Sequence, residues 1–129
     1  MEEEGFWLEV LKLVQKKYRC ANEVARLTKE LAETLSRDDR VSTQVLLGMR
    51  QEEMDVWGQC LREMEVLGNA YPAARERLEA LLRTRTAEEP CTPEEKRIAE
   101  LLVNTRTVIG KAMEIDKHIN LKIAGQDSY

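Results

Sequence analysis

Apolar and small residues recur at alternating intervals of three and four positions between Trp7 and Leu35, with charged residues between them. This spacing places them on one face of an α-helix, because the helix turns once every 3.6 residues. The helix would be about 45 Å long at 1.5 Å per residue. Such a stripe is best buried along a second long helix, which predicts a coiled-coil-like hairpin rather than a compact globule. The stripe consists of Trp7, Val10, Leu11, Val14, Tyr18, Ala21, Val24, Ala25, Thr28, Leu31, Ala32 and Leu35.

The second helix of the hairpin is predicted to follow a tight turn at Ser36–Arg40, which has no apolar residue and several helix-capping side chains. It would run to about Ala70. Folding back about this turn places Trp57 near Cys20. The expected buried side consists of Val45, Met49, Val56, Trp57, Cys60, Leu61, Met64 and Leu67.

Pro72 ends the second helix, because proline has no amide hydrogen to donate, and it suits the first turn of a short third helix. Residues 84–91 are polar and are expected to form a loop. Thr92 and Glu95 then form a capping-box pattern that starts the last helix, which would end at Gly125. The expected fold is an all-α elongated bundle of three to four helices, with residues 1–125 as one domain and 126–129 as a frayed tail.

Composition and charge exclude several functional classes. The 129 residues suffice for one domain, and the net charge of −4 without a basic stripe argues against nucleic-acid binding. The longest apolar runs are far shorter than the roughly 20 residues of a membrane span. The acidic start Met1–Glu4 is unlike a secretory signal. Three cysteines without CxxC spacing indicate reduced thiols, so we expect a cytoplasmic protein.

Catalytic and metal chemistry lack candidate residues. His118 is the single histidine, and Glu114 alone does not complete a metal site with it, so no enzyme, metal or cofactor is expected. Cys20 and Cys60 are expected to be buried packing residues. They lie nearly level in the hairpin, but the reducing compartment argues against a disulfide. Cys91 is expected to be exposed in the loop.

The second helix contains glycines and methionines at Gly48, Gly58, Gly68, Met49 and Met54, with a further methionine at position 64. One interpretation is a soft helix whose surface repacks around a partner, since Met is the most adaptable apolar side chain. The other is close packing of neighbouring helices against the glycines, which we favour.

The second half of the last helix is too apolar for one buried stripe. The short third helix offers few large residues to cover the remainder, so we predict a partner-binding face there. Replacing Ile119 and Ile123 by Asp is then expected to weaken binding and leave the fold intact. The predicted partner-binding residues are Ile109, Met113, Ile115, Ile119 and Ile123.

The chain resembles the small flagellar export chaperones of the FlgN and FliT type. The resemblance is carried by Leu27–Leu35 (LTKELAETL), the turn Ser36–Arg40, the Met49–Met54 segment and Glu114–Ile119 (EIDKHI). It implies a cytoplasmic chaperone that holds a flagellar secretion substrate, of the hook-junction or filament-cap type, through an apolar helical face. Such a protein would be a monomer or a weak dimer, without nucleic acid or a membrane span. The alternative is a homo-oligomerising coiled-coil adaptor with no export role.

Overall fold

A computed structural model describes residues 2–83 and 92–127 of the chain, with side chains described as far as Leu121. These residues form four α-helices and no strand. Their bounds are α1 Glu3–Ser36, α2 Arg40–Ala70, α3 Pro72–Arg83 and α4 Pro93–Asp127. The predicted all-α class, long hairpin, short third helix and long last helix are therefore confirmed. None of the helices in this part of the chain has the length and apolar character that a membrane crossing requires.

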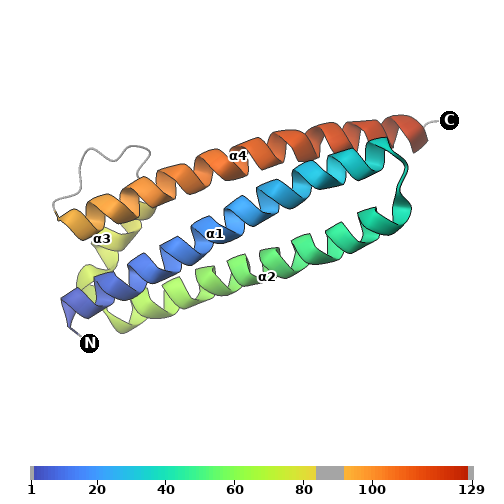
Figure 1. Cartoon of the computed structure of the whole chain (residues 1–129). Coiled ribbons are helices and arrows are strands. Elements are labelled where there is room, and N and C mark those ends of the chain that lie inside the picture. The colour runs from blue at the N-terminus through green and yellow to red at the C-terminus, as the bar shows by residue number, and fades with distance from the viewer. Residues whose placement is uncertain (1, 84–91, 128–129) are drawn as a thin grey trace.

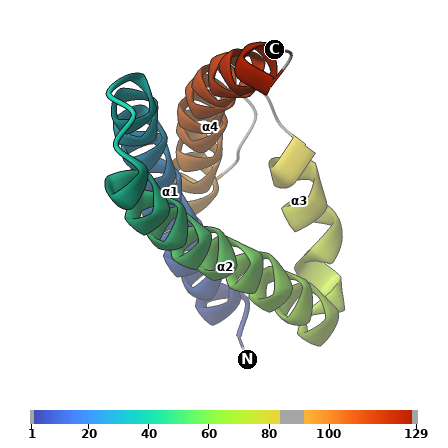
Figure 2. The same ribbon diagram turned by 90° about the vertical axis from the view of Figure 1, so that its right-hand side faces the viewer.

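The three long helices lie side by side, with α1 packed along both α2 and α4. α2 runs antiparallel to α1, whereas α4 runs parallel to it (Figure 1). α3 contacts α2 and α4 and lies opposite α1, in the fourth position of a four-helix bundle (Figure 2). Because α3 is short, it fills this position only at the end of the molecule that holds the start of α1. We call this the closed end, and the end with the α1–α2 turn the open end.

The α1–α2 turn lies where the polar segment predicts it. Asp39 caps α2 by accepting a hydrogen bond from the Ser42 amide at 3.1 Å. Asp38 adopts a left-handed backbone conformation, with φ of 54°. The Thr43 hydroxyl then donates to the Thr34 hydroxyl at 3.0 Å, which joins the two helices directly after the turn. Further along, the Lys17 ammonium lies 4.8 Å from the centre of the Trp57 ring, within one helical turn of the predicted pairing with Cys20.

The largest buried cluster lies at the closed end. Phe6 packs edge-on against Trp7 and stacks on Tyr71, with ring centres 5.0 Å and 5.2 Å apart. α4 begins as predicted, since the Thr92 hydroxyl accepts a hydrogen bond from the Glu95 amide at 3.2 Å. All four helices contribute to this core. Its members are Phe6, Trp7, Val10, Val14, Met64, Ala74, Leu78, Leu81, Ile98, Ala99, Leu101 and Leu102.

Several details of the predicted helix faces are wrong. Val45, Met49 and Leu61 are exposed, although they were expected on the buried side of the second helix. On α1 the buried surface is wider than one stripe, because α1 lies between two helices and must contact both. It therefore also includes Phe6, Cys20, Leu27 and Thr34.

The end of the last helix also differs from the prediction. α4 continues to Asp127, two residues past Gly125, so the predicted stop at this glycine is wrong. The predicted loop at residues 84–91, with Cys91, lies outside the described residues.

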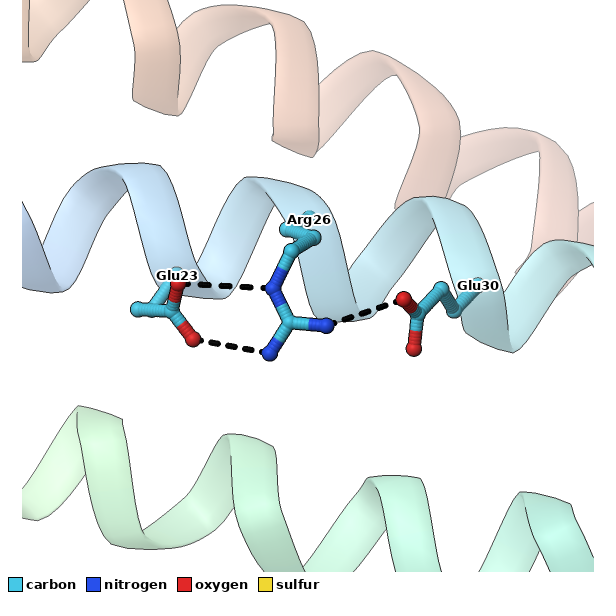
Figure 3. Close-up of polar contacts among 3 residues, drawn as sticks. All are labelled: Glu23, Arg26 and Glu30. Atoms are coloured by element: carbon cyan, nitrogen blue, oxygen red, sulfur yellow. Dashed lines mark hydrogen bonds and ion pairs between the residues drawn. The ribbon is translucent and has the colours of Figure 1, made fainter.

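Ion pairs within single helices lie on the solvent-exposed side of the bundle. The Arg26 guanidinium donates to both carboxylate oxygens of Glu23 and, at 2.9 Å, to Glu30 (Figure 3). These hydrogen bonds lower the pKa of Glu23 and raise that of Arg26. The three residues are spaced three and four apart on α1, so the cluster supports the helix itself.

Candidate partner-binding groove

A groove opens where α3 stops. Among the residues that the structure describes, no fourth helix joins the walls of α2 and α4 beyond Arg83, and a hollow of about 310 Å³ lies between them. Val24 and Thr28 of α1 form its floor. The side chains of its walls are mostly apolar. They come from Met54 and Trp57 on α2, and from Ile109, Ala112 and Met113 on α4.

The groove follows from the lengths of the helices. α3 has 12 residues and spans about 18 Å, whereas α4 has 35 residues and spans about 50 Å. Where α3 covers α2, Gly68 is buried and faces Leu78. Past the end of α3, Met54 is 51% exposed and Met113 is 66% exposed. Both methionines face the position that a longer fourth helix would occupy.

An ion pair joins the two walls across the floor. Nη1 of Arg50 donates to Oδ1 of Asp116 at 2.8 Å and to the Thr28 hydroxyl at 3.3 Å. Arg50 therefore connects α2, α4 and α1 at one level of the open end. Its side chain is 18% exposed and that of Asp116 is 41% exposed, so the pair still faces solvent. The groove thus combines apolar walls with one polar contact, which is a common arrangement in binding sites.

Two cations lie at the end of the groove nearest α3. The Lys17 ammonium is held over the Trp57 ring, and its pKa is lowered by burial and, secondarily, by the charge of Arg106. Arg106 in turn donates a hydrogen bond to the carbonyl of Leu82, at the C-terminal end of α3. At the other end a second, shallower hollow continues along α4 past Lys117 to Leu121.

The five residues predicted to bind a partner are not brought together on one exposed face. Met113 is exposed and Ile109 is half-buried, and both line the groove. Ile115 is half-buried, whereas Ile119 is buried with 8% exposure. Since Ile119 belongs to the packed interior, replacing it by Asp would disturb the fold as well as any binding. The side chain of Ile123 lies outside the described residues.

The α2 wall was not predicted as part of the site. Of its lining residues, Met54 belongs to a seven-residue spacing of exposed apolar residues on α2, since Leu47, Met54 and Leu61 recur every two helical turns on one flank. Our favoured interpretation of the glycines as close-packing positions is wrong for Gly48, because a Cβ there would meet nothing within 4 Å among the described residues. It fits Gly68, which lies under α3.

The thiols and the histidine lie away from the groove. Cys20 and Cys60 are buried and free, as predicted. Burial and the neighbouring Glu53 raise the pKa of Cys20 to about 11, and burial also raises that of Cys60. His118 is exposed on α4. Within the described residues, no three His, Cys, Asp or Glu side chains gather closely enough to hold a metal ion.

Fold and groove together define a helical bundle whose fourth position is filled over only part of its length. Comparisons of the chain with protein-family profiles, with curated proteins and with solved structures find no match.

Proposed function

We propose that this chain is a cytoplasmic binding protein that accepts an amphipathic helix of another protein in the groove between α2 and α4. The observation that carries the proposal is the incomplete fourth position, with apolar walls where α3 no longer covers them. A bound helix would continue the four-helix packing of the closed end along the open end. No catalytic residue is part of this proposal.

The apolar walls offer surface that a partner could bury. Fully burying one Met, Ile or Leu side chain contributes about 1.5–3 kcal/mol. Met54 and Met113 are exposed, and Trp57 and Ile109 are partly exposed. Burying the remaining surface of these four against a partner would contribute favourably to association, against the entropy lost on binding.

The particular role we propose is that of an export chaperone for a flagellar secretion substrate, of the hook-junction or filament-cap type. Three segments that carry the resemblance to such chaperones border the groove. Leu27–Leu35 includes the floor residue Thr28, Met49–Met54 includes the Met54 wall and the bridging Arg50, and Glu114–Ile119 includes Asp116. This coincidence supports the proposal, because a binding surface is where resemblance to a functional relative should concentrate.

Charge substitution of the two methionines tests the proposal. Partners captured from the protein's own cells by crosslinking would be identified, and their binding to purified variants measured. Met54→Asp combined with Met113→Asp should weaken binding by about a hundredfold or more, because both side chains are exposed in the free protein but buried in the complex. Helicity and melting should change little.

Val66→Asp is the matched control, since Val66 is 66% exposed on α2 but lies outside the groove. Equal losses for the control and the double variant would contradict a groove-specific site.

A homo-oligomeric adaptor is the second candidate function. Val41 and Val45 are 77% and 58% exposed on another flank of α2, next to the turn, and could pack against a second copy. Sedimentation separates the two candidates. The chaperone should be a monomer or a weak dimer, whereas the adaptor should form a tight symmetric oligomer that Val45→Asp dissociates.

A further inference from the structure

We infer that the groove selects an acidic amphipathic helix, whose apolar stripe packs between α2 and α4 and whose flanking carboxylates meet basic side chains of the rim. This inference rests on the proposed function and specifies the partner's chemistry. Arg50 and Lys117 line the groove, and Lys17 lies over the Trp57 ring of its α2 wall.

The charge at the groove is opposite to that of the chain. The whole protein has a net charge of −4, so its average surface repels acidic partners. Among the described residues that line the two hollows, Asp116 is the one carboxylate, and Arg50 already neutralises it. Lys117 lines the outer hollow, and Lys17 lies over the Trp57 ring at the inner end. The lining of the groove thus has a small net positive charge on an acidic protein, which favours a partner of opposite charge.

Lys17 is the cation at the inner end of the groove. Burial, and secondarily the charge of Arg106, lowers the pKa of Lys17. A partner carboxylate beside Lys17 would favour the charged form and provide an acceptor for the half-buried ammonium. Trp57 lies beneath Lys17, so an acidic residue here would sit directly beside the apolar wall.

Arg50 offers a second contact point. Both of its hydrogen bonds within the described part of the chain use Nη1, one to Asp116 and one to Thr28. Its Nε and Nη2 donors are therefore placed to bind a carboxylate or a carbonyl from above the floor, in the forked geometry that guanidinium groups favour.

The shape of the groove favours a helix over other anions. Its walls are apolar side chains of Met54, Trp57, Ile109 and Met113, which a phosphate backbone would leave unburied. From Arg106 to Leu121 the α4 wall spans about 22 Å, which corresponds to a helix of about 15 residues. An occupant with an apolar stripe and acidic edges satisfies both the walls and the rim.

Three synthetic peptides of about 15 residues test the inference directly. They share one helical leucine stripe, and their flanking positions are all Glu, all Gln or all Lys. Fluorescence anisotropy of labelled peptides should give an affinity order of Glu over Gln over Lys, with about tenfold or more between the extremes at low salt. The difference should shrink at high salt, because the contacts at the rim are screened.

Two variants of matched charge locate the effect. Lys117→Glu should reduce the preference for the Glu peptide by about threefold or more, since Lys117 lines the outer hollow. Lys111→Glu makes the same charge change at an exposed position on another side of α4 and should leave the preference unchanged.

The outcomes separate the inference from the proposed function. Equal binding of the three peptides, lost in the Met54→Asp and Met113→Asp double variant, would overturn the acidic preference and leave helix binding intact. Absence of binding by all three would overturn both. A dimer that this double variant converts to monomer would show that a second copy fills the groove, which also overturns the inference.

Discussion

At the scale of single residues, burial determines the properties of the two described cysteines. Cys20 lies in the α1–α2 interface with 4% of its surface exposed. Burial, and then the neighbouring Glu53, raises the pKa of its thiol from 9.0 to about 11. Neither this thiol nor Cys60 needs a partner to explain its position, since buried free cysteines behave as small apolar side chains.

The raised pKa of Cys20 predicts a loss of stability in alkaline solution. The folded state holds this proton up to about pH 11, whereas the unfolded thiol releases it near pH 9, so the stabilisation is complete below pH 9 and is lost as pH rises to 11. The loss is on the order of 2 kcal/mol in unfolding free energy. Denaturant unfolding at pH 8 and pH 11 should show wild type losing more than Cys20→Ala by that amount.

Titration of Lys17 changes the free energy of unfolding with pH in the opposite direction from titration of Cys20. The comparison with Cys20→Ala is therefore needed to isolate the effect of the thiol. Its folded pKa lies below 10.5, so its contribution to stability rises with pH up to that value. The same loss in wild type and in Cys20→Ala would contradict the assignment to the thiol.

At the scale of elements, two arginines join helices that are distant in sequence. Arg50 connects α1, α2 and α4 at the open end. Arg77 of α3 donates to Glu3 of α1 at 2.6 Å and to the carboxylate of Glu95 at the start of α4, while its guanidinium lies 5.2 Å from the Trp7 ring. Arg77 thus links the short α3 to both α1 and α4.

Removing the Arg77 charge should destabilise the closed end. Arg77→Met keeps an apolar stem against Trp7 but takes a cation from Glu95, whose side chain is 7% exposed. We expect a loss of about 1–3 kcal/mol, below the range for fully buried pairs because Arg77 is half exposed. Thermal melting of Arg75→Met provides the control, since the partners of Arg75 are exposed, namely Glu79 in α3 and Asn69 at the end of α2, and the variant should lose less than about 0.5 kcal/mol.

Adding Glu95→Gln to Arg77→Met should recover part of the loss, because the buried side chain is then neutral. No recovery would mean that the loss comes from packing against Trp7 and not from the ion pair.

The whole molecule has ends of different stability. The buried residues of α2 are Cys60, Met64 and Gly68, all in its second half, toward the end that α3 covers. The first half of α2 contacts the remainder of the bundle along one side and exposes Met54 and Leu47. Local opening is easiest where few apolar contacts hold an element, so the open end should open first.

Hydrogen exchange provides the measurement. Amides of α2 between Thr43 and Met54 should exchange faster than those between Cys60 and Gly68. The Glu-flanked peptide should slow exchange in the first segment and leave the second unchanged, because it would fill the fourth position only at the open end. Uniform protection along α2 would contradict this difference between the ends.

The sequence by itself determined the helices and their order. The spacing of three and four in α1, the polar turn before Arg40, Pro72 and the Thr92 cap are local signals, so the helix starts and the hairpin could be predicted from them. Only the tertiary structure decided which flanks are buried. Leu27 is buried because α4 and α2 both pack on α1, and Ile119 is interior while Met113 is exposed. The groove likewise depends on how far α2 and α4 extend past the end of α3 in the packed bundle, and no local pattern encodes that relative placement.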